Sequence, residues 1–334
     1  MRGYRTEDSK AFLRTLNEGA RAAIRSCEPM SRHTSFRIGG PADLFFEPPD
    51  LNVLADTLKA AANAGVPVVF LGGGTNVLVS DAGIRGLVVR LGKAFDFRRW
   101  GEAPAGDAEQ ECTASSRPRE AVAVRAGAAT PLSRLVREAV ERGLAGLEFA
   151  AGIPGSVGGA VLMNAGAFGG EIGDAIAGIE AVAEDGEIVA LQGEDLKFSY
   201  RKLALDRPIM VTSVSFRLRH SSVGRLKPVV EAAQKKRRKH QPLGYPNAGS
   251  VFRNPPNDYA GKLVERTGLK GTMVGGAQIS TDHANFIVNV GAASAADVRT
   301  LMRRMQEEVW RKSGIWLEPE VRLVGEWDGA EAAF

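Results

Sequence analysis

The chain has 334 residues, of which 44% are hydrophobic and 25% are charged, and its formal net charge is +4. This length and composition are typical of an ordinary globular protein with a substantial core, and they favour two domains. So small a charge does not demand a nucleic-acid partner, and we expect none, although it suits anionic substrates.

Cysteine usage and apolar content bear on where the chain resides. Cys27 and Cys112 have neither metal-site nor disulfide-framework spacing, which fits a reducing cytoplasm. No apolar run reaches the roughly 20 residues that a membrane span needs, and the N-terminus contains no apolar signal core. We therefore expect a cytoplasmic protein without membrane insertion. We also expect no metal site, because none of the four histidines has ligand spacing: His33, His220, His240 and His283.

Strands and helices are predicted to alternate after a helical N-terminal extension, residues 1–32. Apolar spacing predicts strands at 41–48, 66–71 and 86–91, and a helix at 51–61 that stops at Gly65. Residues from about 99 to 120 are polar and proline-punctuated, without periodicity. We interpret them as a surface insertion between two strands.

The middle of the chain continues this pattern. A strand at 121–128 is followed by a helix, with Thr130 as N-cap, Pro131 at its first position and Gly143 at its end. Alternating residues then predict a hairpin that turns at Asp185–Gly186, and a strand at 209–219.

The character of the sequence changes near His220, where we predict a domain boundary. A basic helix, a helix at 258–267 and a long helix capped by Ser294 and Asp297 follow, before a final strand at 315–325. The predicted division is a helical extension (1–32), a first domain (33–219) and a second domain (220–334).

Two glycine-dense segments, 72–76 and 152–170, are the most informative local features. Glycine destabilises regular elements, so such clusters suggest backbone brought close to a ligand, with N–H groups aimed at phosphate oxygens. A pair of tight turns is the alternative. Val77 occupies a position where a Rossmann fingerprint needs glycine, and no lysine follows Gly159 as in a Walker loop.

The basic run at 235–239 has three interpretations. A solvated helix face is favoured over a nucleic-acid patch, because the run has no interleaved aromatic residues. The third interpretation is local: the charge leads into the loop around Ser250 and could meet a diphosphate.

Three separated segments carry polar groups among glycine-punctuated neighbours. Arg201 follows a predicted turn in FSYRK, Ser250 follows a glycine in NAGSVFRNP, and Glu320 lies on the predicted last strand in LEPEV. Taken singly, Arg201 is explained equally well as a surface salt bridge, whereas a turn hydroxyl is the favoured explanation for Ser250 and a strand-edge charge for Glu320. Their combination with the glycine clusters is more specific.

These blocks, in this order, closely resemble the UDP-N-acetylenolpyruvoylglucosamine reductase family of flavoenzymes. The resemblance runs from about His33 to the final strand. The segments that carry it are HTSFRIGG, LGGGTNVLVSD, GLEFAAGIPGSVGGAVLMNAGAFGGEI, FSYR, NAGSVFRNP, GLKG, GGAQIS, HANFIVN and LEPEV.

The resemblance implies an α+β fold: an FAD-binding domain of the p-cresol methylhydroxylase or vanillyl-alcohol oxidase type, followed by an α+β substrate domain. It implies non-covalent FAD, with NADPH reducing the flavin before UDP-N-acetylglucosamine enolpyruvate enters the same cleft. The implied product is UDP-N-acetylmuramate, a peptidoglycan precursor. Residues implied to bind the cofactor are Gly72, Gly73, Gly74, Thr75, Asn76, Gly152, Ile153, Pro154, Gly155, Ser156, Gly158, Gly159, Asn164, Ala165 and Gly166.

Arg201, Ser250 and Glu320 match the catalytic positions of that family. A hydride from flavin N5 to the vinyl carbon leaves negative charge that Arg201 would stabilise, Ser250 would donate the proton, and Glu320 would orient the enolpyruvyl group or donate a hydrogen bond. The spacing of about fifty residues between Arg201 and Ser250 implies the branch without a tyrosine-bearing lid. Candidate substrate contacts are Asn254, Tyr245, Lys239, Lys262 and Gln278. The alternative function is another FAD-dependent oxidoreductase on the same scaffold.

Overall fold

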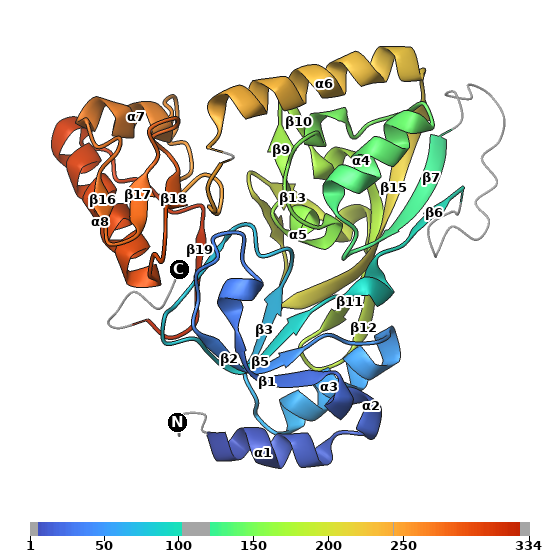
Figure 1. The fold of residues 1–334 in the computed structure, drawn as a ribbon. Helices are drawn as coiled ribbons and strands as arrows, with labels where there is room; N and C mark the ends of the chain where they lie inside the picture. Colours follow the sequence, from blue (N-terminus) through green and yellow to red (C-terminus); the bar gives the residue numbers. More distant parts are fainter. Residues whose placement is uncertain (1–5, 102–120, 243, 328–334) are drawn as a thin grey trace.

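A computed structural model describes residues 6–101, 121–242 and 244–327 of the chain (Figure 1). Its N-terminal region is a four-stranded sheet of order β1-β2-β5-β3, in which β1 and β2 are antiparallel and the other pairs are parallel. The strands are β1 (Ile24–Pro29), β2 (Pro41–Phe46), β5 (Ile84–Arg90) and β3 (Val68–Leu71), and the helices are α1 (Thr6–Thr15), α2 (Glu18–Ala22) and α3 (Leu51–Asn63).

The predicted helical extension is wrong over its last part, because Ile24–Pro29 is strand β1. Pairing with β2 overrides local helix propensity there, since Ser26 lies opposite Leu44 in an antiparallel register. Phe12 and Leu16 of the preceding segment are buried in the main core. The extension is thus part of the first region rather than an appendage.

The second sheet is antiparallel, has order β12-β11-β15-β7-β6, and carries β8 on β15. The predicted insertion joins β6 to β7, and its residues 102–120 lie outside the described part of the chain. The elements are β6 (Arg98–Trp100), β7 (Ala121–Gly127), β8 (Leu144–Ala145), β11 (Ile176–Ala183), β12 (Ile188–Gln192), β15 (Ile209–His220), α4 (Leu132–Glu141), α5 (Val157–Leu162) and α6 (Val223–His240).

The C-terminal region forms a separate orange-to-red group in Figure 1. The predicted cap of α8 is confirmed: the Ser294 hydroxyl accepts the Asp297 amide at 3.0 Å, and the Asp297 carboxylate accepts the Ser294 amide at 2.9 Å. The elements are α7 (Ala260–Thr267), β16 (Met273–Val274), β17 (Ala277–Ile279), β18 (Ile287–Asn289), α8 (Ala295–Ser313) and β19 (Arg322–Val324), which pairs in parallel with β4 (Val77–Val79). Two short hairpins complete the fold: β9 (Gly166–Ala167) with β10 (Gly170–Glu171), and β13 (Lys197–Ser199) with β14 (Lys202–Ala204).

Two predicted element boundaries need correction. Helix α4 begins at Leu132 with Pro131 as N-cap, and the Thr130 hydroxyl donates to the carbonyl of Phe97 instead of capping the helix. Pro131 is held in extended conformation by a backbone bridge to Ser156. The last strand is limited to 322–324, because the segment before it pairs elsewhere: Pro319 forms a backbone bridge with Phe252.

Burial divides the chain into two main cores. One contains residues of both N-terminal sheets and α1–α5, and the other is built from α7, α8 and the small β16–β18 sheet. Helix α6 packs on the first core through Ala233, although it follows the boundary predicted at residue 220. The domain division itself stays a prediction. None of the helices in the described ranges combines the length and apolar composition of a membrane span.

Candidate active site

A cavity of about 470 Å³ lies where the two glycine loops meet. The first loop, 72–76, leaves the end of β3, and the second, 152–159, leads into α5. A Cβ atom added to Gly73 would come within 3.0 Å of the Gly155 Cα atom. The backbones therefore approach as closely as only glycine permits, which explains why both clusters are needed.

Gly74 shows the strictest requirement for glycine. Its φ is +65°, and a Cβ atom there would come within 2.0 Å of the carbonyl oxygen of His33. The backbone after His33 is fixed at this place, because the Ser35 amide donates to the Gly74 carbonyl at 2.9 Å. The first loop is thus clamped against the segment that precedes β2.

Arg201 reaches the cavity from the tight turn of the β13–β14 hairpin. Its φ of +57° is unusual for a residue with a side chain, and such strain often accompanies functional sites. Nη1 donates to the carbonyl of Gly166 at 3.0 Å, and Nε forms an ion pair with the Glu320 carboxylate at 3.3 Å. The hairpin thereby places a cation beside Glu320 in the cavity lining.

Glu320 precedes strand β19 rather than lying within it. Its amide donates to the carbonyl of Val251 at 2.8 Å, and a bridge joins Phe252 to Pro319. The Asn76 side chain donates to the Glu320 carbonyl at 3.0 Å. Burial raises the pKa of the Glu320 carboxyl group, although Arg201 and then Arg253 act in the opposite direction.

Ser250 lies directly beside this junction and lines the cavity. The preceding Gly249 has a φ of +79°, and its amide donates to the Asn247 side chain at 2.9 Å. The Ser35 hydroxyl in turn donates to the Asn247 carbonyl at 2.7 Å. Because the Glu320 amide donates to the Val251 carbonyl, a backbone hydrogen bond joins the loop that contains Ser250 to the segment that contains Glu320.

The structure brings most of the predicted site residues to one cavity. The three residues matched to catalytic positions and Tyr245 line it, and so do the following predicted cofactor residues: Gly72, Gly73, Gly74, Thr75, Asn76, Gly152, Ile153, Pro154, Gly155, Ser156, Gly159, Ala165 and Gly166.

Gly158 and Asn164 are not among the lining residues. A Cβ atom on Gly158 would come within 2.8 Å of the Ala128 Cβ atom, so this glycine serves close packing. Asn164 is fully buried, and its amide donates to Glu171 Oε2 at 2.6 Å and to the Ser199 carbonyl at 3.0 Å. It therefore fixes the hairpin that carries Arg201.

Four predicted substrate contacts also fall outside the lining set: Asn254, Lys239, Lys262 and Gln278. Asn254 accepts the Ala260 amide at 3.1 Å, and Gln278 donates to the Gly271 carbonyl at 3.3 Å. The Lys262 ammonium lies 4.8 Å from the Tyr259 ring centroid, and Lys239 is exposed on α6. Asn254 and Gln278 thus bond within the C-terminal region, and Lys262 stacks on an aromatic ring there.

Arg237 is the main functional candidate that sequence reasoning missed. It lines the cavity from α6 and donates from Nη1 to the Gly152 carbonyl at 3.0 Å. Burial, and then the charge of Arg201, lowers the pKa of Arg237. Helical spacing could have distinguished it from the rest of the basic run, because Val230, Ala233 and Arg237 follow one face.

The cavity therefore has excess positive charge. The Nε atom of Arg237 is buried and makes no hydrogen bond within the described residues, whereas the Nε atom of Arg201 faces the Glu320 carboxylate at 3.3 Å. Arg322 also lines the cavity, whereas the carboxylate there, Glu320, has a raised pKa. Several guanidinium groups around one cavity favour binding of an anion with several acceptor oxygens.

Comparison with known proteins identifies the class first. Residues 42–192 match the model of an FAD binding domain, which agrees with a glycine-lined cavity reached by two loops. The chain is thus an FAD-binding flavoprotein. Residues 241–324 match the model of the UDP-N-acetylenolpyruvoylglucosamine reductase C-terminal domain.

Full-length relatives then identify the family. A UDP-N-acetylenolpyruvoylglucosamine reductase from Agathobacter rectalis is 43% identical over 95% of this chain and 99% of its own. One from Moorella thermoacetica is 42% identical over 96% and 99%. The crystal structure of the Thermus caldophilus enzyme is 35% identical, has a TM-score of 0.71, and matches 89% of this chain and 97% of its own. The chain belongs to the UDP-N-acetylenolpyruvoylglucosamine reductase family and is an oxidoreductase. The family and the α+β fold class with an FAD-binding domain are thereby confirmed.

Proposed function

We propose that the chain reduces UDP-N-acetylglucosamine enolpyruvate to UDP-N-acetylmuramate with NADPH through bound FAD, in peptidoglycan precursor synthesis. The observation that carries the proposal is the convergence of Arg201, Ser250 and Glu320 on the cavity formed by the two glycine loops. Each of the three lies on a different part of the chain, and all three match the motif blocks of the family. The names of the relatives support the same substrate.

The glycine loops fit a bulky phosphate-bearing cofactor. The Gly73–Gly155 approach leaves main chain exposed to the cavity, where amide groups can meet a pyrophosphate without intervening side chains. We assign FAD to residues 72–76 and 152–156, with Gly159, Ala165 and Gly166 as further contacts. Bound FAD would supply hydride transfer, with electrons from NADPH.

Arg201 and Arg237 suit an anionic substrate. Reduction adds a hydride to the terminal vinyl carbon and a proton to the carbon that bears the carboxylate, which gives a saturated ether. Negative charge grows on the carboxylate side before the proton arrives. Arg201, which stands 3.3 Å from Glu320 on a constrained turn, is suited to stabilise that charge.

Ser250 would deliver the proton. A hydroxyl is a weak acid in water, but the enediolate is strongly basic and a buried site shortens the transfer. Glu320, which is ion-paired with Arg201 at 3.3 Å and whose pKa is raised by burial, would orient the enolpyruvyl group. We retain Tyr245 as a candidate diphosphate contact, because it lines the cavity and is half exposed.

The experiment separates the two half-reactions. In Ser250→Ala, flavin reduction by NADPH is expected to proceed as in the wild type, while anaerobic reoxidation by the enolpyruvyl substrate slows about 10²–10⁴-fold. Ser221→Ala, an exposed serine outside the cavity, serves as control. Equal slowing of both half-reactions would assign Ser250 a structural role. Purified protein that takes up no FAD would contradict the proposal, and fast reoxidation by oxygen with no response to substrate would indicate another flavin oxidoreductase.

A further inference from the structure

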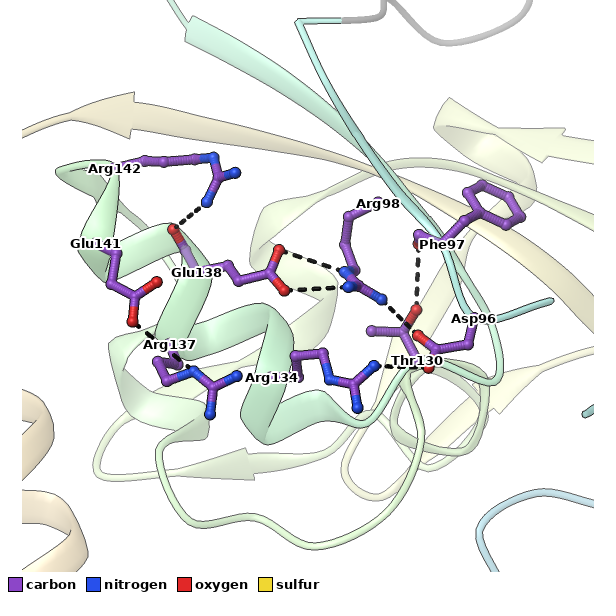
Figure 2. A network of polar contacts seen from close by, with 9 residues as sticks. All are labelled: Asp96, Phe97, Arg98, Thr130, Arg134, Arg137, Glu138, Glu141 and Arg142. Carbon is purple, nitrogen blue, oxygen red and sulfur yellow. Dashed lines mark hydrogen bonds and ion pairs between the residues drawn. The ribbon is translucent and has the colours of Figure 1, made fainter. Parts of the chain in front are cut away.

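A polar network joins side chains of α4 to the segment that contains Asp96 and Arg98 (Figure 2). Asp96 bridges two arginines, with Arg98 Nη1 at 2.5 Å and Arg134 Nη1 at 2.8 Å. Arg98 also holds both carboxylate oxygens of Glu138, at 3.1 and 3.3 Å. The side chains of Asp96, Arg98 and Glu138 are only 24%, 19% and 18% exposed, so water screens these contacts incompletely.

The network fixes the segment that contains Asp96 against the start of α4. The carbonyl of Phe97 accepts the Gly127 amide at 2.8 Å and the Thr130 hydroxyl at 3.2 Å. The Ala129 amide donates to Phe95 O at 3.0 Å. The segment around Asp96 is therefore fixed in two ways. Arg134 and Glu138 of α4 hold it through ion pairs, and the carbonyls of Phe95 and Phe97 hold it through hydrogen bonds to the start of α4.

Residues 128–132, at the start of α4, in turn form hydrogen bonds with the second glycine loop. Thr130 O accepts the Val157 amide at 2.9 Å, Ala128 O accepts the Gly158 amide at 2.9 Å, and the Leu132 amide donates to Gly155 O at 3.0 Å. Gly155 has no side chain to anchor it, so its position depends on these backbone bonds. The path from Asp96 to the cavity wall is therefore continuous.

We propose that Asp96, through Arg98 and Arg134, is a positioning residue for the Gly155–Ser156 wall of the flavin cavity. The inference rests on the proposed placement of FAD against that wall. Without Asp96, Arg134 loses the ion pair described above, and Arg98–Glu138 is the ion pair of this network that still ties the segment around Asp96 to α4. The loop then pays an ordering cost when the cofactor binds, because its conformation is no longer set in advance.

Hydrogen–deuterium exchange of the FAD-free protein tests the proposal without enzymatic activity. In Asp96→Ala, the amides of Leu132, Val157 and Gly158 are expected to exchange about tenfold faster, and the Kd for FAD to rise about tenfold. Exchange of Ile279 and Ile287, in the distant β17–β18 pair, should stay unchanged. Asp96→Asn, which keeps a hydrogen-bond acceptor, is expected to retain part of the FAD affinity.

Arg137→Ala is the matched control, because its ion pair with Glu141 lies on the same helix at 3.8 Å, with side chains 67% and 61% exposed (Figure 2). It should change neither exchange nor FAD affinity. Faster exchange throughout the molecule in the Asp96 variants would make the network a general stabiliser and overturn the inference.

A second variant distinguishes failure of the inference from failure of the flavin placement. Gly155→Ala places a Cβ atom 2.9 Å from Thr75 Oγ1 at a φ of +111°. If this change leaves FAD affinity intact, the cofactor does not use that wall and the placement is wrong. If it weakens FAD binding while both Asp96 variants bind FAD normally, the placement holds and the positioning role is wrong.

Discussion

The two sides of the cavity are built on different principles. On one side, loops 72–76 and 152–159 present backbone, with glycines in close approach and no charged side chain. On the other, Arg201, Arg237 and Glu320 extend charged groups from a hairpin, a helix and a late irregular segment. Under the proposed function, the cofactor would depend on the shape of the glycine loops and the substrate on the charged groups. Substitutions should therefore separate cofactor affinity from substrate chemistry.

Arg201→Ala should give the largest effect and act on the substrate side. We expect reduction of the enolpyruvyl substrate to slow about 10²–10³-fold, because charge stabilisation at the reacting group is lost. The FAD Kd should change less than about threefold. Rapid-mixing measurement of both half-reactions checks this, with exposed Arg207→Ala as control. A comparable loss of FAD affinity would break the distinction between the two sides.

Gly74→Ala should act on the cofactor side. The added Cβ atom would meet the His33 carbonyl at 2.0 Å, so the loop must move, and the FAD Kd should rise about 100-fold. Gly65→Ala is the matched control, because its φ of +64° is the same but its surroundings are open. Fluorescence titration with FAD checks both variants. Equal effects would mean that backbone conformation, rather than close approach, is decisive.

Arg237→Gln should affect both sides, because Arg237 lines the cavity and donates to the Gly152 carbonyl. Losing one charge-assisted hydrogen bond predicts a rise in substrate KM of about tenfold and a smaller loss of FAD affinity. The neighbouring Arg238→Gln, exposed on the same helix, controls for net charge. The same KM from both variants would show that general electrostatic attraction dominates.

Glu320→Gln should give the smallest effect, measured as pH-dependent stability of the FAD-free protein. A carboxyl group with a raised pKa stabilises the folded state below its ordinary pKa, and this contribution is lost as pH rises through the folded value. The Tm of the wild type should therefore fall by roughly 2 °C as the pH rises through the pKa of the folded state, and the Tm of the variant should not show this fall. Glu318→Gln, with a side chain 76% exposed, should keep the wild-type profile. If the Tm of Glu320→Gln falls with pH as in the wild type, another titratable group causes the pH dependence.

Sequence reasoning succeeded where the information is local. The capping box of α8, the apolar face of α4 and the hairpin at Asp185–Gly186 are set by residues within a few positions of one another. It failed where pairing was distant. Ile24–Pro29 is strand because β2 lies beside it, and Thr130 does not cap α4 because Phe97 takes its hydroxyl.

The candidate site shows the same division. Glycine density predicts close backbone approach, but not that Gly158 packs against Ala128 while Gly155 faces the cavity. The basic run at 235–239 gives no sign that Arg237 alone turns toward the cavity, unless its spacing from Ala233 is considered.

Elements with local signals, the glycine loops and, through motif resemblance, the family follow from the amino-acid sequence alone. Which polar groups share a cavity depends on how distant segments fold together. Arg201 and Glu320 are separated by more than a hundred residues, yet their side chains form an ion pair because Glu320 is fixed to Val251 and Asn76 by backbone and amide hydrogen bonds. Such contacts gain their energy after distant segments have folded together, so no short stretch of sequence encodes them.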